Sequence, residues 1–326
     1  MKTFGIIQRE EQRNSKREQN NDKLENQLSG TKQQQNLMNH GGKHNGGPFL
    51  NREKEALKKN LKELELSDAN VQYVRILLTG QIGAGKSSFI NTVNSAFQGR
   101  ITSEALADAD TGTSFTKTYR TYYIRDGESA LPFVFNDIMG LEAGESHGAH
   151  QEDIAKCLEG LLKEGHNFNP VISSKKEDCR SKPSTEDLTY CLVYVIAADK
   201  VSMMEKSVIQ KMRDIRQKAS DLEIPQAIIM TKVDEICPLV RKDLRKIYTS
   251  KKIKEKMQQC SNSVGVPMSH IFPVKNYHEE IDTNDDMDVL ILRALTQIVQ
   301  IADDLLKRRK YDLEKGKTAS YSVEKS

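Results

Sequence analysis

Hydrophobic residues along the chain fall into two patterns, short unbroken runs and repeats at helical spacing. Short apolar runs bounded by turn residues indicate strands, whereas apolar positions at i, i+3, i+4 and i+7 indicate helices. Expected strands cover residues 74–79, 118–124, 131–135, 191–196, 226–230 and 270–274, and expected helices cover residues 52–66, 88–97, 154–162, 204–222, 240–257 and 286–307. Strands and helices alternate, which predicts an α/β domain with three layers and a mostly parallel central sheet.

Residues 118–135 are expected to form a hairpin within this alternating pattern. The run over 118–124 is rich in β-formers, Asp126 and Gly127 supply turn chemistry, and the apolar residues 131–135 return as a second strand. The two strands of a hairpin run antiparallel, so the sequence predicts one antiparallel edge strand in the sheet.

Low-complexity segments set the expected domain boundaries. Residues 1–51 are rich in Gln, Asn, Lys, Glu and Gly, and they carry too few apolar residues to offset the entropy of ordering. We therefore expect a disordered segment over 1–51, a domain with a leading amphipathic helix over 52–309, and a disordered tail over 310–326.

Composition narrows the class of partner. Apolar residues make up 37% of the chain, charged residues 29%, and the net charge is +3. A charge this close to neutral gives no strong footprint for nucleic acid. The longest apolar run, residues 191–198, is too short to span a bilayer. The five cysteines are scattered without C-x-x-C spacing, which is typical of reduced thiols in a cytoplasmic protein.

Residues 80–87 read Gly-Gln-Ile-Gly-Ala-Gly-Lys-Ser, the G-x-x-x-x-G-K-S pattern of a phosphate-binding loop, or P-loop. An expected strand precedes the loop and an expected helix follows it, which is the context that the pattern requires. Glycines let the backbone wrap an anion closely, and N–H groups of the loop and helix N-terminus point at phosphate oxygens. The expected phosphate contacts are Gly80, Gly83, Ala84, Gly85, Lys86, Ser87 and Ser88.

Magnesium and the γ-phosphate are expected to contact several further residues. Lys86 reaches the β- and γ-phosphates in such loops, and the Ser87 hydroxyl ligates Mg²⁺. A polar stretch follows, over residues 99–116, where nucleotide switches lend a threonine to Mg²⁺. Thr113 and Thr116 are the two candidates for that ligand, and an ordinary surface loop is the alternative for the stretch.

The strand over residues 131–135 leads into Asp137 and Gly140, a D-x-x-G arrangement. In GTPases the carboxylate of this arrangement binds Mg²⁺ through water, and the glycine N–H senses the γ-phosphate. Asp137 is therefore an expected metal ligand, and Gly140 is an expected phosphate contact.

A buried strand also leads into Thr231, Lys232 and Asp234, which match the guanine-recognition pattern N/T-K-x-D. The Asp234 carboxylate would accept hydrogen bonds from guanine N1–H and the exocyclic amine, a donor pair that adenine lacks. The Lys232 stem would pack along the base. Thr231 stands where asparagine is commoner, and its hydroxyl is expected to tie this segment to the P-loop. Lys275 and Asn276, after the last strand, are expected near guanine O6.

Together these motifs predict a P-loop NTPase of GTPase-like type, with GTP or GDP and Mg²⁺ as its ligands. Segments within and outside the motifs also resemble the interferon-induced protein 44 family, namely residues 75–80, 83–91, 96–99, 137–142, 168–170 and 231–235. The resemblance covers residues 52–307, and the Phe-Gln-Gly and Asn-Pro segments lie outside the nucleotide motifs. It implies a cytoplasmic, interferon-responsive, antiviral-type protein with a GTPase-like domain.

The residue that follows Gly140 bears on hydrolysis. Efficient switches often place a glutamine there to orient the attacking water, and this chain has Leu141. We therefore expect slow intrinsic GTP hydrolysis, raised by self-association or a protein partner. Two alternatives are a nucleotide-binding scaffold that never hydrolyses and a protein with a vestigial site that acts through contacts alone. A dynamin-like or immunity-related membrane GTPase is a further alternative, against which the absence of a long helical stalk or lipidation site counts.

Overall fold

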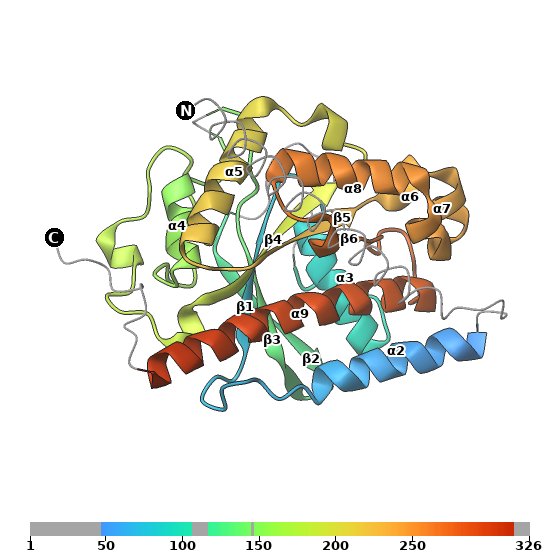
Figure 1. The fold of residues 1–326 in the computed structure, drawn as a ribbon, viewed down its shortest axis with the longest axis horizontal. Coiled ribbons are helices and arrows are strands. Elements are labelled where there is room, and N and C mark those ends of the chain that lie inside the picture. Colours follow the sequence, from blue (N-terminus) through green and yellow to red (C-terminus); the bar gives the residue numbers. More distant parts are fainter. Residues whose placement is uncertain (1–46, 106–116, 145–146, 316–326) are drawn as a thin grey trace, which may run out of the picture. The chain divides into compact units, whose positions relative to one another are not determined.

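Six strands of the described chain form one sheet, in the spatial order β2-β3-β1-β4-β5-β6 (Figure 1). The computed structural model describes residues 47–105, 117–144 and 147–315. The strands are β1 Val74–Thr79, β2 Arg120–Asp126, β3 Ser129–Asp137, β4 Thr189–Ala197, β5 Gln226–Thr231 and β6 Ile271–Pro273. Neighbouring strands run parallel except β2 and β3, which pair antiparallel at one edge. This confirms the predicted mostly parallel sheet with one antiparallel edge strand.

Helices cover both faces of this sheet (Figure 1). They are α2 Gly47–Lys62, α3 Lys86–Gln98, α4 Gln151–Leu158, α5 Lys206–Asp221, α6 Val233–Ile236, α7 Pro238–Lys242, α8 Lys251–Val264 and α9 Asp285–Glu314. Short 3-10 turns lie at Lys176–Asp178, Thr185–Asp187, Val201–Met203, Leu244–Thr249 and Met268–His270. Helices α2, α3 and α9 pack over one face and α4, α5 and α8 over the other, which gives the predicted three layers. Of the helices described, none is both long enough and apolar enough to cross a bilayer.

Burial explains the unbroken apolar runs of the central strands. Strands β1 and β4 are buried along their whole length, because layers of helices cover both faces of the sheet. Strand β2 lies at the edge and exposes several of its residues. The carboxyl ends of β1, β3 and β5 meet at one edge of the sheet, and the P-loop, D-x-x-G and T-K-x-D segments follow those three strands.

The prediction of one continuous helix over residues 240–257 is wrong. The chain there forms α7, a 3-10 turn at Leu244–Thr249, and α8. Asp243 and Ser250 lie at the two junctions, and each side chain accepts a hydrogen bond from a backbone N–H two or three residues further on. Such local bonds compete with helix formation, and an apolar repeat does not report them.

Several ends of elements differ from the predicted ones. Helix α4 begins at Gln151, before the expected start at residue 154, and ends at Leu158, before the expected end at residue 162. The chain turns just after it at Gly160, where φ is +72 and an added Cβ would lie 2.6 Å from the Asp187 carbonyl oxygen. Helix α9 runs to Glu314, beyond the expected domain end at residue 309. Helix α2 begins at Gly47, before the expected start at residue 52.

A buried ion pair joins α2 to α9. The Lys54 Nζ lies 2.6 Å from Oδ2 of Asp288, a fully buried side chain whose Oδ1 accepts a hydrogen bond from the Tyr277 hydroxyl at 2.7 Å. Burial acts to lower the pKa of Lys54, but the hydrogen bonds and charges of Asp288 and Asp285 together outweigh it and raise that pKa. Asp288 therefore links α2 to Tyr277, the residue that follows Asn276.

Candidate functional site

The P-loop has the backbone geometry of an anion cradle. Gly80 has a φ of +145, and an added Cβ would lie 2.1 Å from the Val195 carbonyl oxygen, so the chain leaves β1 through a position that only glycine fits. Gly85 caps α3 with a φ of +90. The loop therefore ends on a helix N-terminus, where backbone N–H groups and the helix dipole favour an anion.

Lys86 and Ser87 are buried at the start of α3, and both contact the ends of strands. The Lys86 ammonium donates to the carbonyl oxygens of Gly80 and Gln81, each at 3.3 Å. The Ser87 hydroxyl donates to Oδ2 of Asp137 at 2.7 Å. A hydroxyl and a carboxylate thus meet from two elements, and such hard oxygen atoms are the ligands that Mg²⁺ prefers. The predicted pair of Ser87 and Asp137 fits a Mg²⁺ ion.

Backbone contacts join the D-x-x-G segment to the P-loop. The Leu141 N–H donates to the Gly80 carbonyl oxygen at 2.9 Å, and Gln81 and Leu141 form a short parallel bridge. Gly140 lies so close that an added Cβ would be 2.6 Å from the Ile82 side chain. The close approach therefore requires a glycine at position 140. The hydrogen bond between Leu141 and Gly80 joins backbone groups and does not depend on either side chain.

Side chains join the base-recognition segments to the P-loop. The Thr231 hydroxyl donates to the Ala84 carbonyl oxygen at 2.7 Å, which confirms the tie predicted for this threonine. The Asn276 amide donates to the Gly85 carbonyl oxygen at 3.0 Å. Within a trans peptide unit the C=O and N–H point in opposite directions. These two bonds therefore turn the N–H groups of Gly85 and Lys86 away from Thr231 and Asn276.

The remaining base-side residues lie beside these tethers. Lys232 adopts a left-handed φ of +56, which is uncommon for a residue other than glycine, and leads from β5 into α6. The Lys275 ammonium lies 4.0 Å from Oδ2 of Asp234 and also pairs with Glu280. Partial burial acts to raise the pKa of Glu280, but hydrogen bonds from the His278 N–H and Lys275 outweigh it and lower the pKa to about 2.

Two predicted metal ligands, Thr113 and Thr116, lie outside the described residues. Gly83 stands inside the P-loop with a φ of +69, and Ser88 lies in the first turn of α3. Ile82 was not among the predicted site residues, although it faces Gly140. Ile82 occupies one of the variable positions of the P-loop pattern, so the pattern gave no reason to select it.

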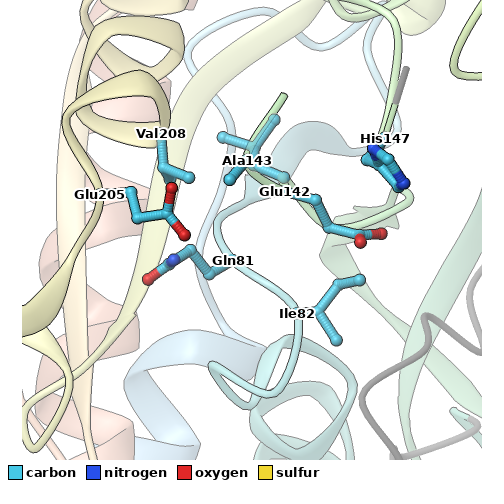
Figure 2. A pocket seen from close by; sticks show the side chains of 8 residues that line it. Gln81, Ile82, Glu142, Ala143, His147, Glu205 and Val208 are labelled. Atoms are coloured by element: carbon cyan, nitrogen blue, oxygen red, sulfur yellow. The ribbon is translucent and has the colours of Figure 1, made fainter. Parts of the chain in front are cut away.

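A pocket of about 320 Å³ lies beside the P-loop (Figure 2). It is lined by Gln81, Ile82, Leu141, Glu142, Ala143, His147, Glu205 and Val208. Three segments therefore line it: the P-loop, the residues after D-x-x-G, and the start of α5 with the residue before it. Figure 2 shows Glu142 and His147 on one side and Glu205 and Val208 on the other. The last two carry no motif, so the sequence offered no signal for their place at this site.

Known proteins similar to this chain include GTPases and interferon-induced proteins. A family model described as interferon-inducible GTPase (IIGP) matches residues 52–152. Human interferon-induced protein 44 is 35% identical over 258 residues, which cover 78% of this chain and 58% of that protein. The chain is homologous to interferon-induced protein 44. Human interferon-induced protein 44-like is 31% identical over 241 residues, and mouse interferon-induced protein 44 is 33% identical over 241 residues.

The homology to interferon-induced protein 44 has a limited extent. The chain spans a little over half the length of these relatives, 58%, 53% and 56% in the order given above. A solved structure of Toc33 from Arabidopsis thaliana in complex with GDP and Mg²⁺ is similar with a TM-score of 0.46 and 13% identity, over 79% of this chain and 93% of that one.

Proposed function

We propose that this domain binds a guanine nucleotide together with Mg²⁺. The hydrogen bond from the Thr231 hydroxyl to the Ala84 carbonyl oxygen carries the proposal, because it joins the base-recognition segment to the phosphate loop. A segment for guanine and a segment for phosphate at one site are what a guanine nucleotide requires. The match to interferon-inducible GTPases supports the same ligand class.

In the proposed complex each motif has a separate task. The N–H groups of the P-loop hold the α- and β-phosphates, and Lys86 neutralises the β- and γ-phosphates. Ser87 ligates Mg²⁺, Asp137 holds it through water, and the Gly140 N–H contacts the γ-phosphate. Asp234 accepts hydrogen bonds from the base, and Lys232 packs along it. Thr113 and Thr116 remain the two proposed further ligands of Mg²⁺, and Lys275 and Asn276 lie on the base side.

We propose further that GTP hydrolysis is slow unless self-association or a protein partner raises its rate. In the reaction, water attacks the γ-phosphorus in line, GDP leaves, and inorganic phosphate is released. The Leu141 side chain is apolar and buried where a water-orienting amide would be useful. Ile82, which faces Gly140, adds a second apolar group on this side.

The names of the homologues support a place in the interferon response. We propose that the protein is interferon-induced and cytoplasmic, and that it acts in innate antiviral defence. Measuring its transcript and its location before and after interferon treatment of cells tests this proposal, and an unchanged transcript level would contradict it.

Competition of GTP, GDP and ATP for a fluorescent GDP analogue tests guanine binding. We expect GTP and GDP to compete at least about 100-fold better than ATP. Adenine lacks the pair of hydrogen-bond donors that the Asp234 carboxylate would accept from guanine. Asp234→Asn should weaken GDP binding and improve the binding of xanthosine diphosphate, whose extra carbonyl accepts from the new amide. Lys86→Ala should abolish nucleotide binding, and Lys218→Ala, at a surface ion pair with Glu159, is its control. Equal competition by ATP would contradict the base assignment.

A single-turnover assay with purified protein and GTP tests the proposed hydrolysis. We expect a slow first-order release of phosphate that rises with protein concentration if copies of the chain stimulate one another. Fast hydrolysis at low protein concentration would contradict the role given to Leu141. Tight GTP binding with no phosphate release at any concentration would select the scaffold alternative.

A further inference from the structure

The ammonium group of Lys211 lies among three backbone carbonyls of one loop. Its Nζ donates to the carbonyl oxygens of Glu142, Gly144 and His147, at 3.0, 2.6 and 3.2 Å. A lysine ammonium has three N–H donors, and these three acceptors match them in number. Lys211 lies one turn beyond Val208 on α5, and the loop and α5 both line the pocket in Figure 2.

This loop directly follows the D-x-x-G segment and is closed at its base beside Gly140. Leu141 and Gly148 form a short antiparallel bridge, and the Ala149 N–H donates to the Gly140 carbonyl oxygen at 3.3 Å. Gly148 has a φ of +77, and an added Cβ would lie 2.7 Å from that same carbonyl oxygen. The base of the loop thus contacts Gly140, and its middle contacts Lys211.

Within the described part of the chain, all the hydrogen bonds that the Lys211 ammonium donates go to this one loop. Among the residues that the structure describes, its ammonium forms these three bonds to carbonyls and no ion pair. Hydrogen bonds from a charged donor are roughly twice as strong as those between neutral groups. The charged Lys211 ammonium therefore holds the backbone of this loop against α5. An ion pair with a surface side chain would not restrain the loop backbone in this way.

We infer that Lys211 is a positioning residue through which α5 holds this loop, keeps Gly140 against the P-loop, and favours GTP over GDP. The inference rests on the proposed function, in which the Gly140 N–H contacts the γ-phosphate that only the triphosphate carries. Lys211 contacts neither the P-loop nor the base-side residues in the structure. Its removal therefore acts on the γ-phosphate contact and leaves the GDP contacts in place.

Lys211→Met tests the inference, because methionine keeps most of the apolar stem and removes the charge. We expect a non-hydrolysable GTP analogue to bind about 10-fold more weakly, with GDP affinity changed by less than about 2-fold. In nucleotide-free protein, hydrogen exchange at residues 140–144 and 147–149 should accelerate. Lys218→Met is the matched control, since Lys218 lies on the same helix and pairs with Glu159 at the surface. It should change neither quantity.

Other outcomes would overturn the inference. A role in stability alone would weaken GTP and GDP binding by the same factor while lowering Tm. An unchanged ratio of the two affinities in a folded variant, together with unchanged exchange, would remove the positioning role and leave the proposed function intact. Failure of the wild-type chain to bind either nucleotide would overturn the proposed function, and this inference with it. Lys211→Gln is the second variant if the methionine variant does not fold.

Discussion

The P-loop is held on its two sides by different chemistry. On the base side, the side chains of Thr231 and Asn276 donate to two consecutive loop carbonyls. On the γ-phosphate side, the Ser87 hydroxyl bonds to Asp137 at the expected Mg²⁺ site, but Gly140 is held by a backbone contact, in which the Leu141 N–H donates to the Gly80 carbonyl oxygen. The first arrangement depends on residue type, and the second depends on how closely two backbones approach.

This difference separates the expected effects of mutation. The base-side tethers orient N–H groups that would contact phosphates common to GDP and GTP, so damage there should weaken both nucleotides alike. The γ-phosphate side meets a group that only GTP carries, so damage there should weaken GTP alone. The ratio of GTP to GDP affinity therefore reports which side has been altered.

Among the changes that separate the two sides, the largest effect is expected on the γ-phosphate side, from Gly140→Ala. Gly140 has no side chain to remove, so its contact with the P-loop must be broken by adding an atom, and the new Cβ would lie 2.6 Å from the Ile82 side chain. We expect about 100-fold weaker binding of a non-hydrolysable GTP analogue and nearly unchanged GDP binding, both measured by fluorescence titration. Gly165→Ala is a control for general destabilisation, because its φ of +84 strains any side chain while its added Cβ meets nothing within 4 Å, and it should leave both affinities unchanged. Equal losses for both nucleotides would contradict the separation of the two sides.

Thr231→Val tests the stronger of the two base-side tethers. Valine has the shape of threonine without its hydroxyl, so the buried Ala84 carbonyl oxygen loses the donor that lies 2.7 Å away. An unsatisfied buried acceptor costs about 1–3 kcal/mol, and we expect about 10-fold weaker binding of GDP and of GTP by titration calorimetry. Thr231→Ser keeps the hydroxyl and should stay close to wild type. A loss confined to GTP would show that the tether acts on the other side.

Asn276→Ala should have a smaller effect than Thr231→Val. The Gly85 carbonyl oxygen loses the Asn276 donor but keeps the Phe89 N–H at 2.9 Å, so it is not left without a partner. We expect about 5-fold weaker binding of GDP and GTP, in the same assay. Asn276→Asp has nearly the same shape without the donor, and it should lose at least as much. If only the aspartate variant weakens binding, the cause is the negative charge of the new carboxylate and not the loss of the hydrogen bond to Gly85.

The two sides also differ in how far the sequence could predict them. Thr231 was predicted to tie the loop because its hydroxyl stands at a known position of a motif. The contacts of Asn276 with Gly85 and of Lys211 with its loop join residues 191 and 64 to 69 positions apart. Neither contact has a local pattern, since both depend on which elements the fold brings together.

The same distinction applies to the fold. The parallel sheet was predictable because burial on both faces leaves an unbroken apolar run, as in β1 and β4. The broken helix around Asp243 and Ser250 was not, because two short side chains there bond to nearby backbone N–H groups without changing the apolar repeat.

The smallest expected effect concerns acid stability on the base side, through Glu280. Its pKa is about 2 in the folded protein, below the ordinary value of 4.5, so folding is stabilised by its charged form. The contribution is complete above pH 4.5 and is lost as the pH falls from there towards 2. We expect Glu280→Gln to lower the free energy of unfolding by about 1 kcal/mol at pH 6, a modest value because the pair with Lys275 is partly exposed. Urea unfolding at pH 3.5 should show a smaller difference between the two proteins than at pH 6. A difference that grows on acidification would mean that the Glu280 carboxylate is not the stabilising form.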